Sequence, residues 1–309
     1  MVAAVAAAAT LTCSPQAGLG TATFRRGGKQ HVLDLSTCRE SVRTGPAPAP
    51  RRGVRAPDGT VATVRSTGHG RTAKQTIWAR GRPVFTETQY YKSIGPGDTP
   101  GPIELLGWSG DSRWIFFTVD PGGSGSIAAD GLILRVVSAK GGRVHKLGPM
   151  LAYPDYLAWC GAMLVWSGGG DRLSTDHKRL LAAAPPDWRP RPVVREPQRA
   201  WGSVVCGGDG RSVVVQSQPK SADSNFFHTH WSLWRVGVDG RRTQLTSPPA
   251  GFADDAPTRV GDTLYFVRTR QGRGSLYALR RGKLLGPFAS LGYSVGYYGH
   301  NDRTYSVTP

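Results

Sequence analysis

WSGDSRWIFFTV, residues 108–119, contains the pattern from which the architecture is predicted. Within it a Ser-Gly-Asp-Ser segment, typical of a tight turn, precedes a run of aromatic and β-branched residues with the composition of a strand. Asp suits such a turn because its carboxylate accepts hydrogen bonds from its own backbone. The stretch therefore predicts a turn at 109–112 followed by a strand.

The same arrangement recurs along the chain. A short turn segment comes before TVATVRS, MLVWS, RSVVVQS and TLYFVRT, as it does before RWIFFTV. The equivalent turn positions lie 53, 51, 47 and 53 residues apart, at Asp58, Asp111, Ala162, Asp209 and Asp262. A repeat of about 50 residues indicates an array of similar structural units. The turn aspartates are expected to form turns and not to carry function.

The later half of the repeat also reads as a hairpin. It is visible in LILRVVSAKGGRVHKL (132–147), WSLWRVGVDGRRTQLT (231–246) and SLYALRRGKLLGPF (275–288). The central turns are Gly141-Gly142, Asp239-Gly240 and Arg281-Gly282, and glycine is favoured there because tight hairpin turns require positive φ. Two hairpins in about 50 residues predict the four antiparallel strands of one propeller blade.

The blade count follows from the repeat boundaries. Five complete units lie at 50–95, 103–150, 153–197, 200–248 and 252–289. Residues 20–44 contain three strand patterns without the first one, and the tail from 291 onward supplies the missing strand. We therefore predict an all-β fold, a six-bladed propeller whose ring is closed by the C-terminal strand joining the N-terminal blade. Seven blades are the alternative if the tail forms more than one strand. Residues 20–309 are one domain, and 1–19 are an export segment or a disordered tail.

The repeats resemble a known family. The pattern W-S-x-D-x-R-W-I-x-F from Trp108 and the strand ending RRTQLT (241–246) resemble the TolB-like, WD-type beta-propeller repeat. The resemblance covers nearly the whole chain after residue 20, although the 160–197 unit has no turn Asp. It implies a binding or scaffold module. The N-terminal α/β domain of TolB has no counterpart here, so partner binding through that domain is not expected.

Composition excludes several classes of protein. Apolar residues make up 39% of the chain and aromatics 9%, which is enough for a core and too little for a multi-span membrane protein. Lys and Arg number 39 against 21 Asp and Glu, a net charge of +18. Only eight of the basic residues are Lys, and the Arg are scattered. The surplus of Arg has two open explanations, the codon bias of a GC-rich genome and the binding of an anionic polymer. The basic blocks are too short to indicate a specific nucleic-acid partner. A monomer is expected.

The N-terminus and the cysteines point to export. Residues 1–13 contain an apolar run too short to span a bilayer, similar to the apolar part of a secretory signal, with Ala7-Ala8-Ala9 as a cleavage site. A disordered Ala-rich tail and a lipidated Cys13 are the alternatives. Four cysteines without a C-x-x-C pair predict the disulfides Cys160–Cys206 and Cys13–Cys38 in an extracytoplasmic protein; four buried free thiols are the alternative.

Motifs of known enzyme classes are missing. Repeats of this type also form lids on serine peptidases, whose nucleophile lies in a G-x-S-x-G motif. The two segments most similar to this motif end in Ser126 and Asp111 instead of Gly. The sequence has no P-loop, Rossmann fingerprint or H-E-x-x-H. We therefore assign no catalytic residue, no cofactor and no metal, and we expect a protein that is not an enzyme.

The candidate binding residues lie in the loops between the second and third strands of the blades. In a propeller these loops open onto one face, and loops on a rigid scaffold are where function concentrates. His228-Thr-His230 is a possible half of a metal site. His300-Asn301-Asp302 is expected to form a hairpin turn, and the tryptophans are expected to pack between blades. The candidates are His69, Arg71, Asp171, Arg172, Asp176, His177, Asp223, His228, His230, Arg270 and Arg273.

Two functions from different classes remain open. The first is an extracytoplasmic binding module for a protein or an anionic cell-envelope polymer. The second is a hydrolase or lyase that uses a carboxylate or histidine from 167–178 and 217–230, with or without a metal; a weaker third is polynucleotide binding. Polar groups that converge on an axial pocket favour an enzyme, and a charged rim favours a macromolecular partner.

Overall fold

The fold was established from a computed structural model of the chain. It describes residues 13–43, 53–67, 72–90, 103–120, 131–223, 229–293, 300 and 304–309. Within these ranges the regular structure is β, apart from a single three-residue 3-10 turn, η2 (Pro154–Tyr156). The described part of the chain contains no helix with the length and apolarity to cross a membrane.

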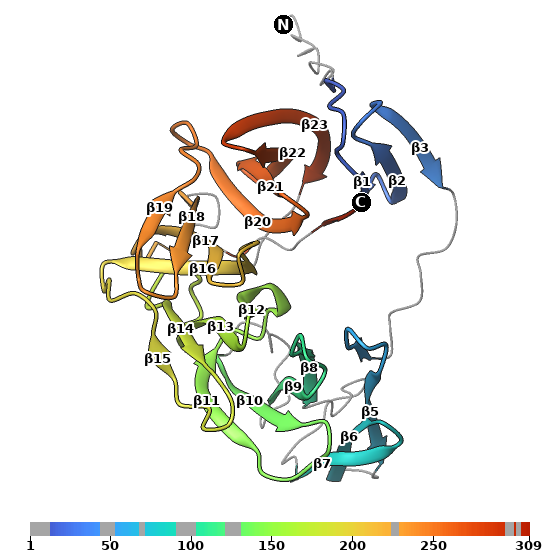
Figure 1. Cartoon of the computed structure of the whole chain (residues 1–309), viewed down its shortest axis with the longest axis vertical. Coiled ribbons are helices and arrows are strands. Elements are labelled where there is room, and N and C mark those ends of the chain that lie inside the picture. The colour runs from blue at the N-terminus through green and yellow to red at the C-terminus, as the bar shows by residue number, and fades with distance from the viewer. Residues whose placement is uncertain are drawn as a thin grey trace, which may run out of the picture.

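In the described part of the chain, the strands form six sheets of four antiparallel strands each (Figure 1). Blade one is β24 (Tyr305–Thr308), β1 (Thr21–Arg26), β2 (Lys29–Asp34) and β3 (Arg39–Arg43). Blade two is β4 (Val54–Arg55), β5 (Val61–Thr67), β6 (Thr72–Ala79) and β7 (Arg82–Tyr90), and blade three is β8 (Ile103–Trp108), β9 (Trp114–Val119), β10 (Leu132–Ser138) and β11 (His145–Met150). Blade four is β12 (Leu157–Cys160), β13 (Met163–Gly168), β14 (Arg179–Ala183) and β15 (Arg191–Pro192). Blade five is β16 (Arg199–Cys206), β17 (Ser212–Pro219), β18 (Ser232–Gly237) and β19 (Arg242–Gln244), and blade six is β20 (Ala253–Val260), β21 (Thr263–Arg270), β22 (Arg273–Arg280) and β23 (Lys283–Tyr293).

The predicted fold of six four-stranded blades is confirmed, and so is the pairing of the C-terminal strand with the N-terminal blade. The six blades coincide with the six sequence units, so the seven-bladed alternative is wrong. The C-terminal strand β24 pairs antiparallel with β1, from Thr21 opposite Thr308 to Phe24 opposite Tyr305, so blade one is built from both ends of the domain. Neighbouring blades pack in the order one, six, five, four, three, two, and in Figure 1 blades one and two stand apart.

The core lies between successive blades. Phe24 and Tyr305 of blade one pack with Tyr265 of blade six in one buried cluster. Trp166 of blade four, which is 0% exposed, packs with Phe116 of blade three in another. The expected packing role of the tryptophans is therefore confirmed, with Trp108, Trp166 and Trp231 buried and Trp114, Trp159 and Trp234 packed against the clusters.

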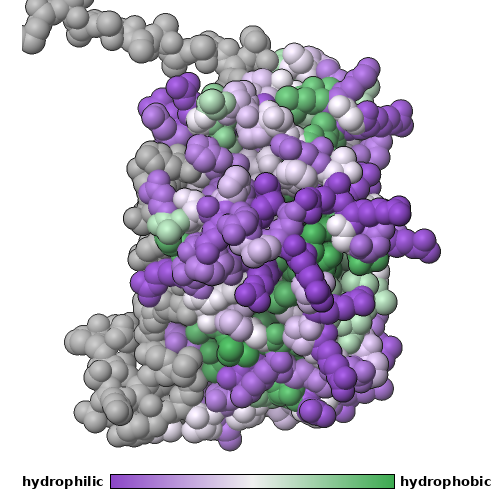
Figure 2. All heavy atoms as spheres, turned by 90° about the vertical axis from the view of Figure 1, so that its left-hand side faces the viewer, coloured by the Kyte–Doolittle hydropathy of each residue, from purple (hydrophilic) through white to green (hydrophobic). Residues whose placement is uncertain are grey.

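The outer side of the propeller is polar. The outermost strand β19 is exposed along its length. Figure 2, which views the protein from the side of blades four and five, shows hydrophilic residues over most of this surface and small separate apolar patches. Stability therefore comes from the surfaces between blades.

The turn aspartates act as predicted. Asp58 accepts a hydrogen bond from the backbone N–H of Thr60 at 2.9 Å, and Asp209 accepts one from Arg211 at 2.9 Å. These backbone hydrogen bonds are the main reason that the pKa values of Asp58 and Asp209 lie below the ordinary value. Asp111 makes the equivalent bond to Arg113 at 3.1 Å. The repeated Asp therefore fixes the hairpin between the first and second strands.

Both predicted disulfides are present. Cys160–Cys206 joins the ends of β12 and β16, the innermost strands of blades four and five. Cys13–Cys38 ties the start of the described chain to the turn between β2 and β3. The alternative of free thiols is therefore wrong. A lipid on Cys13 is also incompatible with this structure, because its sulfur is part of the disulfide.

Glu104 on the innermost strand β8 makes stability depend on pH. Burial raises the pKa of this carboxyl from 4.5 to about 7, and its Oε2 has no hydrogen-bond partner among the described residues. The folded protein therefore holds a proton that the unfolded chain releases, a stabilisation that is complete below pH 4.5 and is lost as the pH rises through 7. Glu104→Gln should remove this dependence and raise the free energy of unfolding at pH 8 by about 3 kcal/mol.

The measurement is urea unfolding of both proteins between pH 4 and 8. The free energy of unfolding of Glu104→Gln should exceed that of wild type by an amount that grows as the pH rises from 4 to 8. The control Glu87→Gln changes a carboxylate that is 30% exposed and is 3.6 Å from Arg135, and should not reproduce the effect. Parallel pH profiles for wild type and Glu104→Gln would contradict the assignment.

Candidate functional site

The antiparallel order of each blade gives the propeller two distinct faces. Turns between the first and second strands, and between the third and fourth, lie on one face, which we call the turn face. Loops between the second and third strands, together with the connections between blades, lie on the opposite face, the loop face. The sequence-predicted candidates were expected on the loop face.

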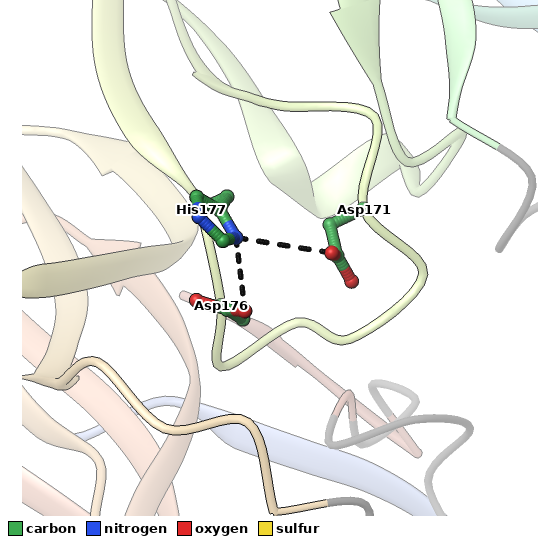
Figure 3. A group of neighbouring side chains, drawn as sticks. All are labelled: Asp171, Asp176 and His177. Carbon is green, nitrogen blue, oxygen red and sulfur yellow. Dashed lines mark ion pairs between the residues drawn. The ribbon is translucent and has the colours of Figure 1, made fainter.

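One loop of blade four brings three of the predicted residues together. The loop between β13 and β14 carries Asp171, Asp176 and His177, and one ligand-type atom of each lies within 4.8 Å of the others. The Nδ1 of His177 is 2.9 Å from Oδ2 of Asp176 and 3.8 Å from Oδ2 of Asp171 (Figure 3). Lys220, just after β17 of blade five, places its Nζ 2.9 Å from Nε2 of His177 and 3.3 Å from Oδ1 of Asp176. We call these four residues the loop cluster.

A buried lysine organises this loop from inside. The ammonium of Lys178 donates to the backbone carbonyls of Asp171 at 2.6 Å, Leu173 at 2.7 Å and Asp176 at 3.0 Å. The residue is 1% exposed, and burial lowers its pKa to about 8. The three carbonyls satisfy all three donors of the ammonium and hold the loop around a single point.

Backbone contacts fix the loop to both neighbouring blades. The N–H of Gly169 donates to the carbonyl of Pro149 in blade three at 2.8 Å. On the other side, the hydroxyl of Thr175 donates to the carbonyl of Ser221 at 2.9 Å, and the Ser221 N–H returns a bond to the Thr175 carbonyl at 3.0 Å. The loop therefore spans blades three to five in one conformation.

The loop cluster contains metal-ligand residue types but also its own cation. Two carboxylates and an imidazole are a common donor set for divalent metals. Here the ammonium of Lys220 already contacts both His177 and Asp176. A metal would have to displace that lysine, since the two cations repel each other at this distance. The arrangement therefore fits an ion-pair network better than a metal site.

A second polar group on the loop face was not predicted. The Nε2 of His300 lies 3.1 Å from both carboxylate oxygens of Asp155 in η2. The hydroxyl of Ser203 in β16 donates to Oδ2 of the same Asp155, and the ring of Tyr153 stacks on His300 with centroids 3.7 Å apart. His300 is 4% exposed; Asn301 and Asp302, with which it was expected to form a hairpin turn, lie outside the described residues. We call Tyr153, Asp155, Ser203 and His300 the inner cluster.

The inner cluster has the residue types of a serine hydrolase in a different order. In such a triad the histidine lies between the serine, whose proton it takes, and the carboxylate. Here the carboxylate of Asp155 lies between Ser203 and His300. The hydroxyl of Ser203 therefore donates its hydrogen bond to a carboxylate, and the imidazole does not activate it. The cluster instead joins blade four, blade five and the connection that leads to β24.

The remaining predicted residues have other positions. His69, Arg71 and His228 lie outside the described residues. Exposed side chains on the loop face include Arg172, Asp223 and His230. Arg270 and Arg273, expected in a loop between the second and third strands, instead face each other as strand residues, because β21 and β22 are joined by only two residues, Gln271 and Gly272, both at positive φ. Arg270 lies over the ring of Phe252, 5.3 Å from its centroid.

Comparison with known proteins shows the fold. No family model matches the chain, and no curated protein matches it. TolB from Acinetobacter baumannii is 10% identical with a TM-score of 0.45, over 85% of this chain and 61% of that one. A structure of prolyl endopeptidases is 10% identical with a TM-score of 0.50, over 94% of this chain and 46% of that one. The chain is a beta-propeller.

TolB structures are therefore among its neighbours, as the sequence resemblance implied. The putative TolB from Agrobacterium tumefaciens is 13% identical with a TM-score of 0.48, over 94% of this chain and 100% of that one. The chain spans less than two thirds of the Acinetobacter TolB and less than half of the prolyl endopeptidase. At these identities the comparison concerns the fold alone.

Proposed function

We propose that this propeller is an extracytoplasmic binding module that holds a protein partner on its loop face, around the loop cluster. The TolB-like fold and the two disulfides support this proposal, because disulfides persist in oxidising compartments. Removal of residues up to Ala9 would leave Cys13 in the exported protein. The proposal keeps residues 20–309 as one propeller domain.

The observation that carries the proposal is an exposed charged rim on a loop that is already fixed. The side chains of His177, Asp171 and Lys220 are 61%, 39% and 32% exposed. Lys178 and the contacts to both neighbouring blades already order the loop in the free protein. The loop therefore loses little conformational entropy when a partner binds. Charges of both signs on such a rim supply orientation and specificity to a protein interface.

The chemistry of the site favours a protein over the other candidates. An anionic polymer would meet the exposed carboxylate of Asp171 at the rim, with the carboxylate of Asp176 just beneath it. A hydrolase needs a group that is free to act on a substrate, whereas both ring nitrogens of His177 contact other side chains of the loop cluster. Ser203 is oriented toward a carboxylate and not toward a base.

Retention of envelope proteins on the immobilised propeller tests the proposal. The loop-face variant combines Asp171→Asn, His177→Gln and Lys220→Gln. A matched control combines Asp239→Asn and Arg241→Gln, a more exposed ion pair on the turn face. We expect a discrete partner that wild type and control retain equally and that the loop-face variant binds at least about tenfold more weakly, since a few residues dominate most interfaces. Equal retention by all three proteins would contradict the proposal.

A further inference from the structure

A basic pocket lies on the turn face, opposite the loop cluster. It has a volume of about 120 Å³ between blades two and three and is lined mainly by Arg80, Ser112, Arg113, Trp114, Ser138 and Lys140. Its volume is somewhat below the roughly 150 Å³ of a cavity that accommodates benzene. The pocket therefore admits a ligand group of only a few heavy atoms.

Three turns each bring one cation to this pocket. Arg80 lies in the turn between β6 and β7, Arg113 in the turn before β9, and Lys140 in the turn after β10. Among the described residues, no carboxylate lines the pocket. Two of its cations, Arg80 and Arg113, pair with Asp58 and Asp111, which belong to the adjoining first turns of blades two and three. The pocket lining therefore carries three cations, and the carboxylates that balance two of them lie outside it.

The backbone around the pocket departs from the repeat. The position after the turn Asp is Gly59 in blade two and Gly210 in blade five, both at positive φ. In blade three it is Ser112, at φ 57°, a conformation that a residue with a Cβ rarely adopts. Such outliers persist where the surrounding structure holds them, and they are frequent at ligand sites.

Ser112 uses both of its oxygens to build the pocket wall. Its hydroxyl accepts a hydrogen bond from the N–H of Asp58 at 3.1 Å, which links blades two and three. Its carbonyl accepts a bond from Nη2 of Arg80 at 3.1 Å, and the same Nη2 donates to Asp58 at 2.8 Å. Arg80 is therefore held in place before any ligand arrives, with further N–H donors of the guanidinium fork beyond Nη2.

Two serines also line the pocket. Hydroxyls of Ser112 and Ser138 add groups that donate or accept as needed. A small ligand rich in acceptor oxygens and carrying negative charge matches this set of donors and cations.

We propose that this pocket binds a tetrahedral oxyanion, the phosphate or sulfate group of a larger anionic molecule. The pocket is on the face opposite the rim that we propose for the protein partner, so the two sites are independent. It also gives part of the +18 net charge a defined location. A free inorganic anion and an anionic polymer share this chemistry, and the experiment separates them.

Titration with inorganic phosphate at constant ionic strength tests the site. Calorimetry should show saturable binding of one phosphate per chain, and Lys140→Gln and Arg113→Gln should each weaken it at least fivefold. The matched control is Arg281→Gln. Arg281 is the counterpart in blade six of Arg80 in blade two: it has the same position in the turn between the third and fourth strands, a similar φ of 50° and an aspartate partner, Asp262. It does not line this pocket. Circular dichroism and melting temperature verify that each variant is folded.

The outcomes are distinct. Saturable binding that is lost in the pocket variants and kept in Arg281→Gln supports the site. Poly(glycerol phosphate) that binds more tightly than phosphate, with the same variant pattern, identifies a polymer as the source of the oxyanion; equal affinity identifies a small molecule. Binding without saturation, or equal loss in Arg281→Gln, is a general effect of the basic surface and overturns the proposal. Retention of the protein partner should be unchanged in all these variants.

Discussion

Asp254→Asn is expected to lower the free energy of unfolding by about 3–5 kcal/mol, the usual cost of leaving a buried charge without its partner. Asp254, at the start of β20, is 0% exposed and accepts two hydrogen bonds from Arg268, at 2.7 and 2.9 Å. The hydrogen bond to Asp254 also raises the pKa of Arg268, whose side chain is only 11% exposed. Without the carboxylate the guanidinium remains charged inside blade six.

Urea unfolding monitored by tryptophan fluorescence measures the effect. Asp239→Asn is the control, since Asp239 and its partner Arg241 are 58% and 92% exposed and an exposed pair contributes at most about 1 kcal/mol. The double variant Asp254→Leu with Arg268→Met removes both charges and should recover most of the loss. A change below about 1 kcal/mol in Asp254→Asn would show that the ion pair does not support the blade.

Replacing Cys160 and Cys206 with serine is expected to lower the free energy of unfolding by about 4 kcal/mol, on the chain-entropy account of a crosslink over this separation. The two cysteines are 46 residues apart and tie the innermost strands of blades four and five. The loop cluster is built across the same two blades. Removing this disulfide should therefore also increase amide hydrogen exchange around Ser221, which forms a hydrogen bond with Thr175 across the boundary between blades four and five.

Wild type treated with a reductant loses both disulfides and should therefore be less stable than the Cys160/Cys206 variant under oxidising conditions. The Cys13–Cys38 disulfide closes a shorter separation of 25 residues and lies in blade one. Replacing these two cysteines should therefore lower the free energy of unfolding slightly less and should leave amide exchange around Ser221 unchanged. If the Cys160/Cys206 variant melts at the wild-type temperature under oxidising conditions, the bond does not stabilise the boundary between these blades.

The repeat made the fold predictable because a propeller blade is encoded locally. Asp58, Asp111 and Asp209 each accept a hydrogen bond from the backbone N–H two residues away, so the position of the Asp in the sequence is enough to place a hairpin. The similar contexts of Cys160 and Cys206, one repeat apart, likewise placed them at equivalent ends of adjacent strands. Blade count and disulfide pairing followed from such short-range patterns.

The sites were less predictable because their contacts are made between distant segments. His300 meets Asp155, 145 residues earlier, and Ser203 meets the same carboxylate from 48 residues away. Lys178 has no pattern that separates it from a surface lysine, yet it is buried under three carbonyls. Only the clustering of Asp171, Asp176 and His177 within one loop was visible in the sequence.

The tight turn between β21 and β22 lacked its usual signal in the sequence. Two-residue hairpin turns usually contain Asn-Gly or Asp-Gly, whose first residue tolerates positive φ. Here Gln271 adopts φ 48° before Gly272. Arg270 and Arg273 consequently lie in the strands of a regular hairpin and not in a loop.

Site-specific photo-crosslinking is the most direct test of the proposed function. A photoreactive residue at Arg172 stands on the loop face beside the loop cluster, and one at Lys283 stands on the turn between β22 and β23. We expect position 172 to form one discrete crosslinked product with an envelope protein, and position 283 to form none. The same product from both positions, or from position 283 alone, would contradict binding through the loop face.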